Sequence, residues 1–231
     1  MKKITITFTC LFFFTLFVAG QTTYQIGESL DFFRSYKMQQ GEYSLLLNES
    51  NIEGSPYLND EFINGTIYTT SKTQYQNIPL RFNIFNDNLE FKTPDDAVMS
   101  IAVPEIVESA VFGEYKMCYI PYTISKKIKR GFLIELVSDH VSLYAKPEVL
   151  YKKPQEPAPY KEAEPAKFLP KADSYYLRAG KEEAQKITGK KDLIQSFPDH
   201  QKEVTDFIKK NKINPGKESD LINLVNFYNS L

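Results

Sequence analysis

Apolar and polar residues alternate in short runs between positions 65 and 152, and turn residues separate the runs. The clearest run is IPLRFNIF (78–85), whose apolar positions are Ile78, Leu80, Phe82 and Ile84. A period of two is typical of a β-strand with one buried face. We therefore expect a half-buried strand at residues 78–85.

A second strand is expected directly after this one. Asn86, Asp87 and Asn88 predict a tight turn, because Asn and Asp tolerate left-handed backbone conformations. A two-residue loop would pair Phe85 with Glu90, and a four-residue loop would keep the same faces. A shift by one residue would mix the faces instead. Either favoured register places Leu89 and Phe91 on the apolar face.

The opposite face of this hairpin supplies the candidate ligand or partner contacts. They are Arg81, Asn83, Glu90 and Lys92. Polar side chains on a sheet surface are most often simply solvated, and in that case Arg81 would contribute little to stability.

Further strands are expected at residues 65–70, 115–124, 132–137 and 141–146. FLIELV (132–137) is nearly all apolar, as in a strand that is covered on both faces. Short strands with turns between them predict an antiparallel meander. We therefore expect a mainly β domain over residues 21–152, curved into a sandwich or an open barrel.

The composition changes at residue 153. Residues 153–172 contain five prolines among lysines and glutamates, which predicts an extended, polyproline-like linker. It could be a free tether, or it could lie across the β-domain with Tyr160 and Phe168 as anchors.

The remaining segment, 173–231, predicts one more strand at YYLRAG (175–180) and then a small helical cap. KKDLIQSF forms a short helix that ends before Pro198, and Asp199 can cap the next helix. The last helix has an apolar stripe at helical spacing, formed by Leu221, Leu224, Val225, Tyr228 and Leu231. These helices are expected to pack on the sheet or on each other.

The first twenty residues are typical of a secretory signal peptide. A basic MKK precedes an uncharged apolar run that is shorter than the ~20 residues needed to span a bilayer. Small residues at Ala19 and Gly20 predict cleavage between Gly20 and Gln21. Cys10 lies too early for a lipoprotein anchor, so we expect an exported periplasmic or secreted protein without a transmembrane segment in the mature chain.

Few residues suggest chemistry. The two histidines, His140 and His200, lie far apart in turn-like contexts, which argues against a metal site. Cys118 shares a strand face with Lys116 but is expected to be a small buried hydrophobe. Glu135 interrupts an apolar strand without a second carboxylate to pair with. No cofactor or catalytic motif is expected.

The formal net charge of −1 gives no basis for nucleic-acid binding. The basic run KKIKR (126–130) could meet an anionic surface, although a solvated loop is the simpler interpretation.

Three segments together resemble a group of secreted proteins common in Bacteroidetes. They are GSPYLNDEFINGTIYT (54–69), IPLRFNIFNDNLEF (78–91) and KKDLIQSFPDHQKEVTDFIKKNKI (190–213). The resemblance implies export from a Gram-negative cell and a shared architecture. It implies no activity.

The sequence thus leaves three functional hypotheses. The first is a non-catalytic extracytoplasmic protein that binds an envelope protein or serves as a structural component of the envelope. The second is a lipid or lipoprotein carrier, whose apolar pocket would be lined by Phe82, Ile84 and Phe91. The third is a hydrolase without a recognisable motif.

Overall fold

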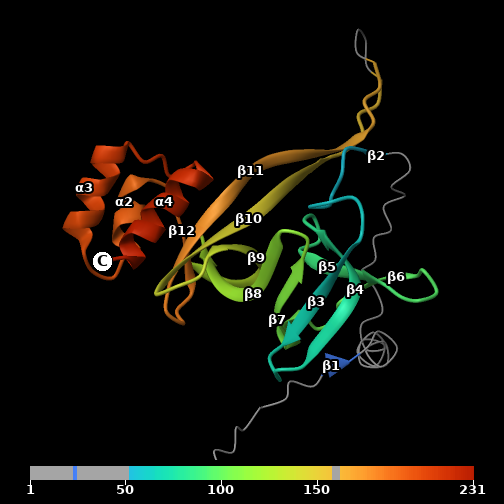
Figure 1. Ribbon diagram of the computed structural model, residues 1–231. Helices are drawn as coiled ribbons and strands as arrows, with labels where there is room; N and C mark the ends of the chain where they lie inside the picture. Colours follow the sequence, from blue (N-terminus) through green and yellow to red (C-terminus); the bar gives the residue numbers. More distant parts are fainter. Residues whose placement is uncertain (1–22, 25–51, 158–161) are drawn as a thin grey trace, which may run out of the picture.

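Twelve strands form one continuous sheet in the computed structural model, which describes residues 23–24, 52–157 and 162–231. The main path runs β12-β11-β10-β9-β8-β7-β3-β4-β5-β6, and β1 and β2 pair at its sides. Pairs along the main path are antiparallel, and most join strands that are neighbours in sequence (Figure 1). The predicted mainly β meander with helices at its C-terminal end is therefore confirmed.

The strands before the barrel are β1 (Thr23–Tyr24), β2 (Ile52–Glu53), β3 (Ile63–Thr69), β4 (Gln74–Asn83), β5 (Asn88–Lys92), β6 (Val98–Ser100) and β7 (Val107–Phe112). A single 3-10 turn, η2 (Pro104–Ile106), joins β6 to β7. The barrel strands are β8 (Tyr115–Ile124), β9 (Lys127–Val137), β10 (Val141–Lys152), β11 (Ala166–Ala179) and β12 (Ala184–Lys186).

The last five strands close into a barrel because β12 pairs with both β11 and β8. The β12–β8 pairing is parallel and joins Ala184 to Tyr122 and Gln185 to Thr123. The first half of β8 uses the same edge of that strand to pair with β7, from Phe112–Tyr115 to Ser109–Cys118. The sequence predicted a sandwich or an open barrel. It did not show the closure, since β12 has only three residues and no alternating pattern.

Three apolar clusters fill the structure. Cys118, Tyr122, Leu133, Tyr144 and Tyr176 belong to the cluster that the strand pairings place inside the barrel. A second cluster joins β3–β7 to the other face of β8–β10. It includes Ile67, Leu80, Phe82, Leu89, Phe91, Phe112, Met117 and Phe132. The third lies between β10, β11 and the helices.

The β4–β5 hairpin has the predicted faces with the longer of the two loops. Phe82 pairs with Leu89 and Leu80 with Phe91, so residues 84–87 form a four-residue connection. The two-residue loop is not observed. Ile84 therefore lies in the turn and is only partly buried, although Leu80, Phe82, Leu89 and Phe91 are buried as expected.

The expected proline-rich linker is instead part of a long hairpin. Residues 166–172 belong to β11, and Pro170 pairs with Val149 in the middle of the ladder. Residues 153–157 and 162–165 continue the two strands, with a bridge between Gln155 and Glu164. The outer half of β10–β11 therefore projects from the barrel as an arm, from Glu148–Lys171 to Lys152–Lys167 (Figure 1). Phe168 is buried, as an anchor should be; Tyr160 lies outside the described residues.

Three helices cover β10 and β11 on the side of the barrel away from the arm: α2 (Lys190–Gln195), α3 (Gln201–Asn211) and α4 (Glu218–Asn229) (Figure 1). An amide pair fixes α4 to β10, because Asn229 accepts from the Val141 N–H and donates to its carbonyl, at 3.0 and 2.9 Å. The predicted cap at Asp199 is wrong. His200 occupies the N-cap position of α3, and Asp199 accepts a hydrogen bond from Tyr228.

The predicted signal peptide and its cleavage site after Gly20 lie outside the described residues. Among the helices that are described, none combines the length and the apolar character that a membrane span requires.

We expect the helices to unfold together with the barrel, because α4 completes an apolar core that β10 and β11 share. Leu224→Ala removes a fully buried side chain and should cost about 2–5 kcal/mol of unfolding free energy. Leu231→Ala, at an exposed position just beyond the same helix, should cost less than about 0.5 kcal/mol. Denaturant melts followed by circular dichroism would measure both. A separate early transition in the Leu224→Ala protein would contradict a shared core.

Candidate functional site

The polar face of the β4–β5 hairpin is covered by the chain that precedes β3. Leu58 donates a backbone hydrogen bond to the Phe82 carbonyl at 3.0 Å, and Ile84 donates to the Pro56 carbonyl at 2.8 Å. Tyr57 forms an isolated antiparallel bridge with Asn83. Residues 56–58 thus run beside the end of β4, where its pairing with β3 has stopped at Ile63–Leu80.

A buried ion pair lies under this covering segment. Arg81 and Glu90 are directly opposite each other on β4 and β5. The Nη2 and Nε atoms of Arg81 both donate to Glu90 Oε2, at 2.8 and 3.2 Å. Only 15% of the Arg81 side chain and 9% of the Glu90 side chain are exposed. Each charge therefore depends on the other, because little water reaches either.

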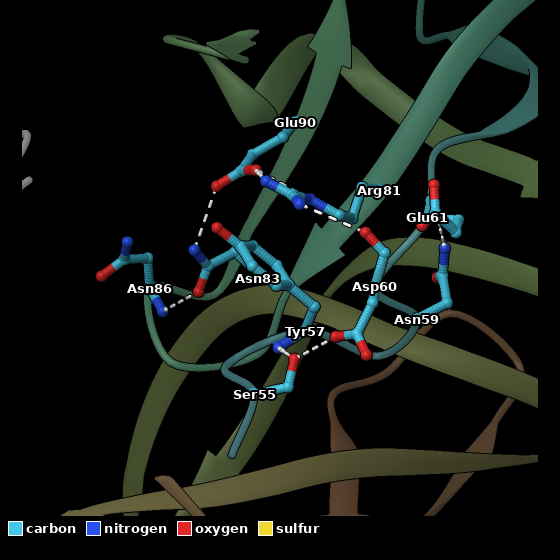
Figure 2. A network of polar contacts seen from close by, with 9 residues as sticks. All are labelled: Ser55, Tyr57, Asn59, Asp60, Glu61, Arg81, Asn83, Asn86 and Glu90. Atoms are coloured by element: carbon cyan, nitrogen blue, oxygen red, sulfur yellow. Dashed lines mark hydrogen bonds and ion pairs between the residues drawn. The ribbon is translucent and has the colours of Figure 1, made fainter. Parts of the chain in front are cut away.

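Asn83 extends the network on the other side of Glu90. Its Nδ2 donates to Glu90 Oε1 at 3.0 Å, and its Oδ1 accepts from the Asn86 backbone N–H at 3.0 Å. Figure 2 shows Asn83 between Glu90 and the turn residue Asn86. The side chain thus ties the buried carboxylate to the four-residue loop.

Two aromatic rings complete the surroundings of Arg81. Its guanidinium carbon lies 3.5 Å from the centroid of Tyr57 and 4.5 Å from that of Phe62. Arg81 Nη1 also donates to the Asp60 carbonyl at 3.2 Å (Figure 2). A guanidinium on an aromatic face gains further stabilisation from the ring quadrupole.

The structure therefore brings three of the four candidate residues together. Arg81, Asn83 and Glu90 form one buried network, whereas Lys92 lies at its margin, paired with Asp96 at 3.3 Å and 5.2 Å from the Phe62 ring centroid. The solvated interpretation is wrong for the buried three. The alternation of apolar and polar residues along a hairpin predicts its two faces, but it does not show that residues 54–62 fold back over the polar face.

A pocket of about 490 Å³ opens beside this network. Its walls are Ile52, Gly54, Ser55, Pro56, Tyr57, Asp60, Arg81 and Phe168. Two of the lining residues are bonded to each other, because Ser55 donates to the Asp60 carboxylate (Figure 2). The lining can therefore stack against a ligand and accept hydrogen bonds. Its cation, Arg81, is already paired with Glu90.

Gly54 is required where the pocket meets the arm. Its φ is +80°, and a Cβ there would lie 2.3 Å from the Phe168 carbonyl oxygen. Both the left-handed backbone and this close approach demand glycine. The residue thus allows β2 to pair with the start of β11.

A second polar cluster lies at one end of the barrel interior. Glu135 accepts from Lys116 Nζ at 2.5 Å and from the Cys118 thiol at 3.7 Å. Burial, together with the Glu135 carboxylate, raises the pKa of the Cys118 thiol to about 12. The thiol thus stays protonated and buried, whereas a nucleophilic cysteine needs a lowered pKa and access.

The other residues considered for chemistry lie in separate parts of the fold. Among the described residues, no group of three His, Cys, Asp or Glu side chains is placed to share a metal ion. His140 is exposed in the β9–β10 turn, and His200 begins α3. Phe82 and Phe91, expected to line a lipid pocket, are packed in the core, where Phe82 meets the Phe132 ring edge-on at 5.9 Å.

Comparison with known proteins gives no relative of this chain. No protein-family model matches it, and no match was found among curated proteins or solved structures.

We expect Glu90→Gln to destabilise the protein by about 3 kcal/mol or more, because it leaves Arg81 buried without a counter-charge. Glu108→Gln is the matched control. The Lys72–Glu108 pair has a similar 2.6 Å contact, but its side chains are 72% and 49% exposed, so the loss should stay below about 1 kcal/mol. Denaturant melts would give both values. Equal small losses would show that the covering segment does not exclude water.

Cys118 should react slowly with a thiol reagent in the native protein and quickly in denaturant, because the reagent needs an accessible thiolate. Since the folded-state pKa is raised from 9.0 to about 12, the contribution of the protonated thiol to stability is fully present below pH 9. It should fall as the pH rises towards 12. Labelling kinetics and melts against Cys118→Ala would measure both effects. Fast native labelling at neutral pH would contradict the buried assignment.

Proposed function

We propose that this protein is an exported, non-catalytic component of the cell envelope that binds another envelope protein through the β10–β11 arm. The observation that carries this proposal is an exposed apolar pair on the arm. Leu150 and Leu169 lie directly opposite each other and are 53% and 41% exposed. Folding of the described chain leaves both side chains largely in water, so a partner that covered them would gain hydrophobic stabilisation.

Charged pairs surround the two leucines on the same face. Lys171 contacts Glu148 at 2.7 Å on one side. On the other side, Lys152 contacts Glu164 at 2.5 Å and Lys167 contacts Glu53 at 2.9 Å. An apolar centre with a polar rim is the usual anatomy of a protein interface. Because these charges are already paired, the apolar centre would supply most of the affinity.

The opposite face of the arm is supported from within the protein. Phe85, Tyr151 and Phe168 pack on one another, with ring centroids 5.3–5.9 Å apart. Phe85 belongs to the β4–β5 loop, so the aromatic contacts join the arm to the rest of the sheet. A surface that is held in place before binding loses less conformational entropy on association.

The ionisable groups elsewhere support binding rather than catalysis. Arg81 is neutralised by Glu90, and Lys116 by Glu135. The pKa of Cys118 is shifted away from reactivity. The apolar N-terminal segment and the resemblance to secreted proteins support the export part of this proposal.

Site-directed photo-crosslinking in the native envelope would test this proposal. A photoreactive residue at Leu150 or Leu169 should give the same protein adduct from either position. Val98 is the control, because it is similarly exposed on β6 and should not give that adduct. The Leu150→Ser/Leu169→Ser protein should fold with less than about 1 kcal/mol of change and lose the partner. Identical adducts from Val98, or full retention of the partner by the double variant, would contradict the proposal.

A further inference from the structure

The turn between β8 and β9 concentrates positive charge at the end of a hairpin. Four of the five positions from 126 to 130 are cations: Lys126, Lys127, Lys129 and Arg130. All four are exposed. The whole chain has a formal net charge of −1, so this concentration is local and not a reflection of overall composition.

These lysines are not matched by carboxylates. In the part of the chain that the structure describes, Lys126, Lys127 and Lys129 form no ion pair, and Arg130 lies over the Tyr119 ring at 5.5 Å. Lys116, at the start of β8, is by contrast paired with Glu135 at 2.5 Å. The charge of this hairpin tip, residues 125–130, is therefore available to an external anion.

The barrel wall holds the tip in a defined position. Ser125 and Lys126 have φ values of 50° and 63°, as the central residues of a two-residue hairpin turn of the type that fits strand twist. Pairing then runs without interruption from Ile124–Lys127 to Met117–Ile134. The cations are thus presented by a continuous ladder.

An exposed apolar side chain belongs to the same stretch of β9 as three of these cations. Ile128 is 63% exposed, more than any other large hydrophobic residue in the described part of the chain. It lies opposite Thr123 and on the same strand face as Arg130, whereas Lys127 and Lys129 project to the other face of the hairpin. Covering this side chain would remove apolar surface from water and so stabilise a complex.

We propose that the 125–130 tip docks on an anionic phospholipid bilayer. The lysines and Arg130 would lie at the phosphate-bearing headgroups, and Ile128 would enter the boundary between headgroups and acyl chains. Basic residues around an exposed apolar side chain are typical of surfaces that lie at such an interface. A soluble polyanion would use the charges and leave Ile128 in water.

This surface is separate from the one assigned to a protein partner. The arm consists of residues 148–152 and 167–171, whereas the tip is the β8–β9 turn. Membrane docking can therefore fail while the arm still binds its partner, and the reverse also holds.

The absence of tryptophan from the sequence provides a direct probe. Ile128→Trp introduces a single tryptophan at the tip of the full-length protein. With vesicles of equal parts phosphatidylcholine and phosphatidylglycerol, its emission should shift to shorter wavelength, and brominated acyl chains should quench it. Pure phosphatidylcholine should give neither change. Leu231→Trp, at an exposed position near the end of α4, should give no change with either vesicle.

The charge requirement is tested with native Ile128 in place. Vesicle flotation should show weaker binding by Lys126→Gln/Lys127→Gln/Lys129→Gln, by roughly fivefold for each charge removed. Raising the salt concentration should weaken the wild type in the same direction. The control is Lys190→Gln/Lys191→Gln/Lys202→Gln, which removes equal charge from exposed positions on and near the helices and should bind like the wild type. All these proteins keep residues 1–20, so lipid binding by that segment is common to them.

Three results would overturn the proposal. The first is an Ile128→Trp emission that is the same with anionic and neutral vesicles. The second is an equal loss of binding in both triple variants, which would show a response to net charge alone. The third is tight binding of the tip to a soluble polyanion such as heparin without any binding to vesicles.

Discussion

One edge of β8 is shared by two partner strands, β7 and β12, and this sharing determines how the whole sheet is arranged. The first half of β8 pairs with β7 and the second half with β12 along that edge. The same sheet can therefore close into a barrel and continue outward through β7, β3, β4, β5 and β6. The continuing strands cover the outer face of β8–β9, and the helices cover β10–β11. Each apolar face of the barrel wall is thus buried without a separate domain.

The arm is a consequence of strand length within this arrangement. β9 pairs with β10 only at residues 143–145, whereas β10 and β11 have 12 and 14 residues. Their outer halves extend past the barrel and need support of their own. β2 supplies it along one edge of β11, and Phe85 supplies it on one face. Pro147 and Pro170 lack the N–H groups that would make an open strand edge prone to association with further strands.

The sequence predicted the elements whose pattern is local. Period-two alternation located the β4–β5 hairpin and its faces, and helical spacing located α4, because each signal depends only on neighbouring residues. Barrel closure depends on two residues of β12 that pair with β8 about sixty positions away, and no local sequence pattern encodes that pairing. The proline-rich composition indicated a linker, yet pairing with β10 made most of its second half a strand. The sequence analysis also missed Tyr57 and Phe62, which cover Arg81. Their segment, residues 54–62, folds back over β4 through tertiary contacts that no local pattern encodes.

The buried ion pair accounts for the choice between the two hairpin registers. Both registers place Phe82, Leu89 and Phe91 on one face, so hydrophobic burial does not distinguish them. In the observed register Arg81 lies opposite Glu90.

The two-residue loop would place Glu90 opposite Phe85 and Arg81 opposite Pro94 instead. Two charges under the covering segment would then lack partners, at a cost of several kcal/mol. A register slip would also separate Asn83 from Glu90, which now bond at 3.0 Å. The polar face of this hairpin therefore sets its alignment, while the apolar face determines only which side is buried.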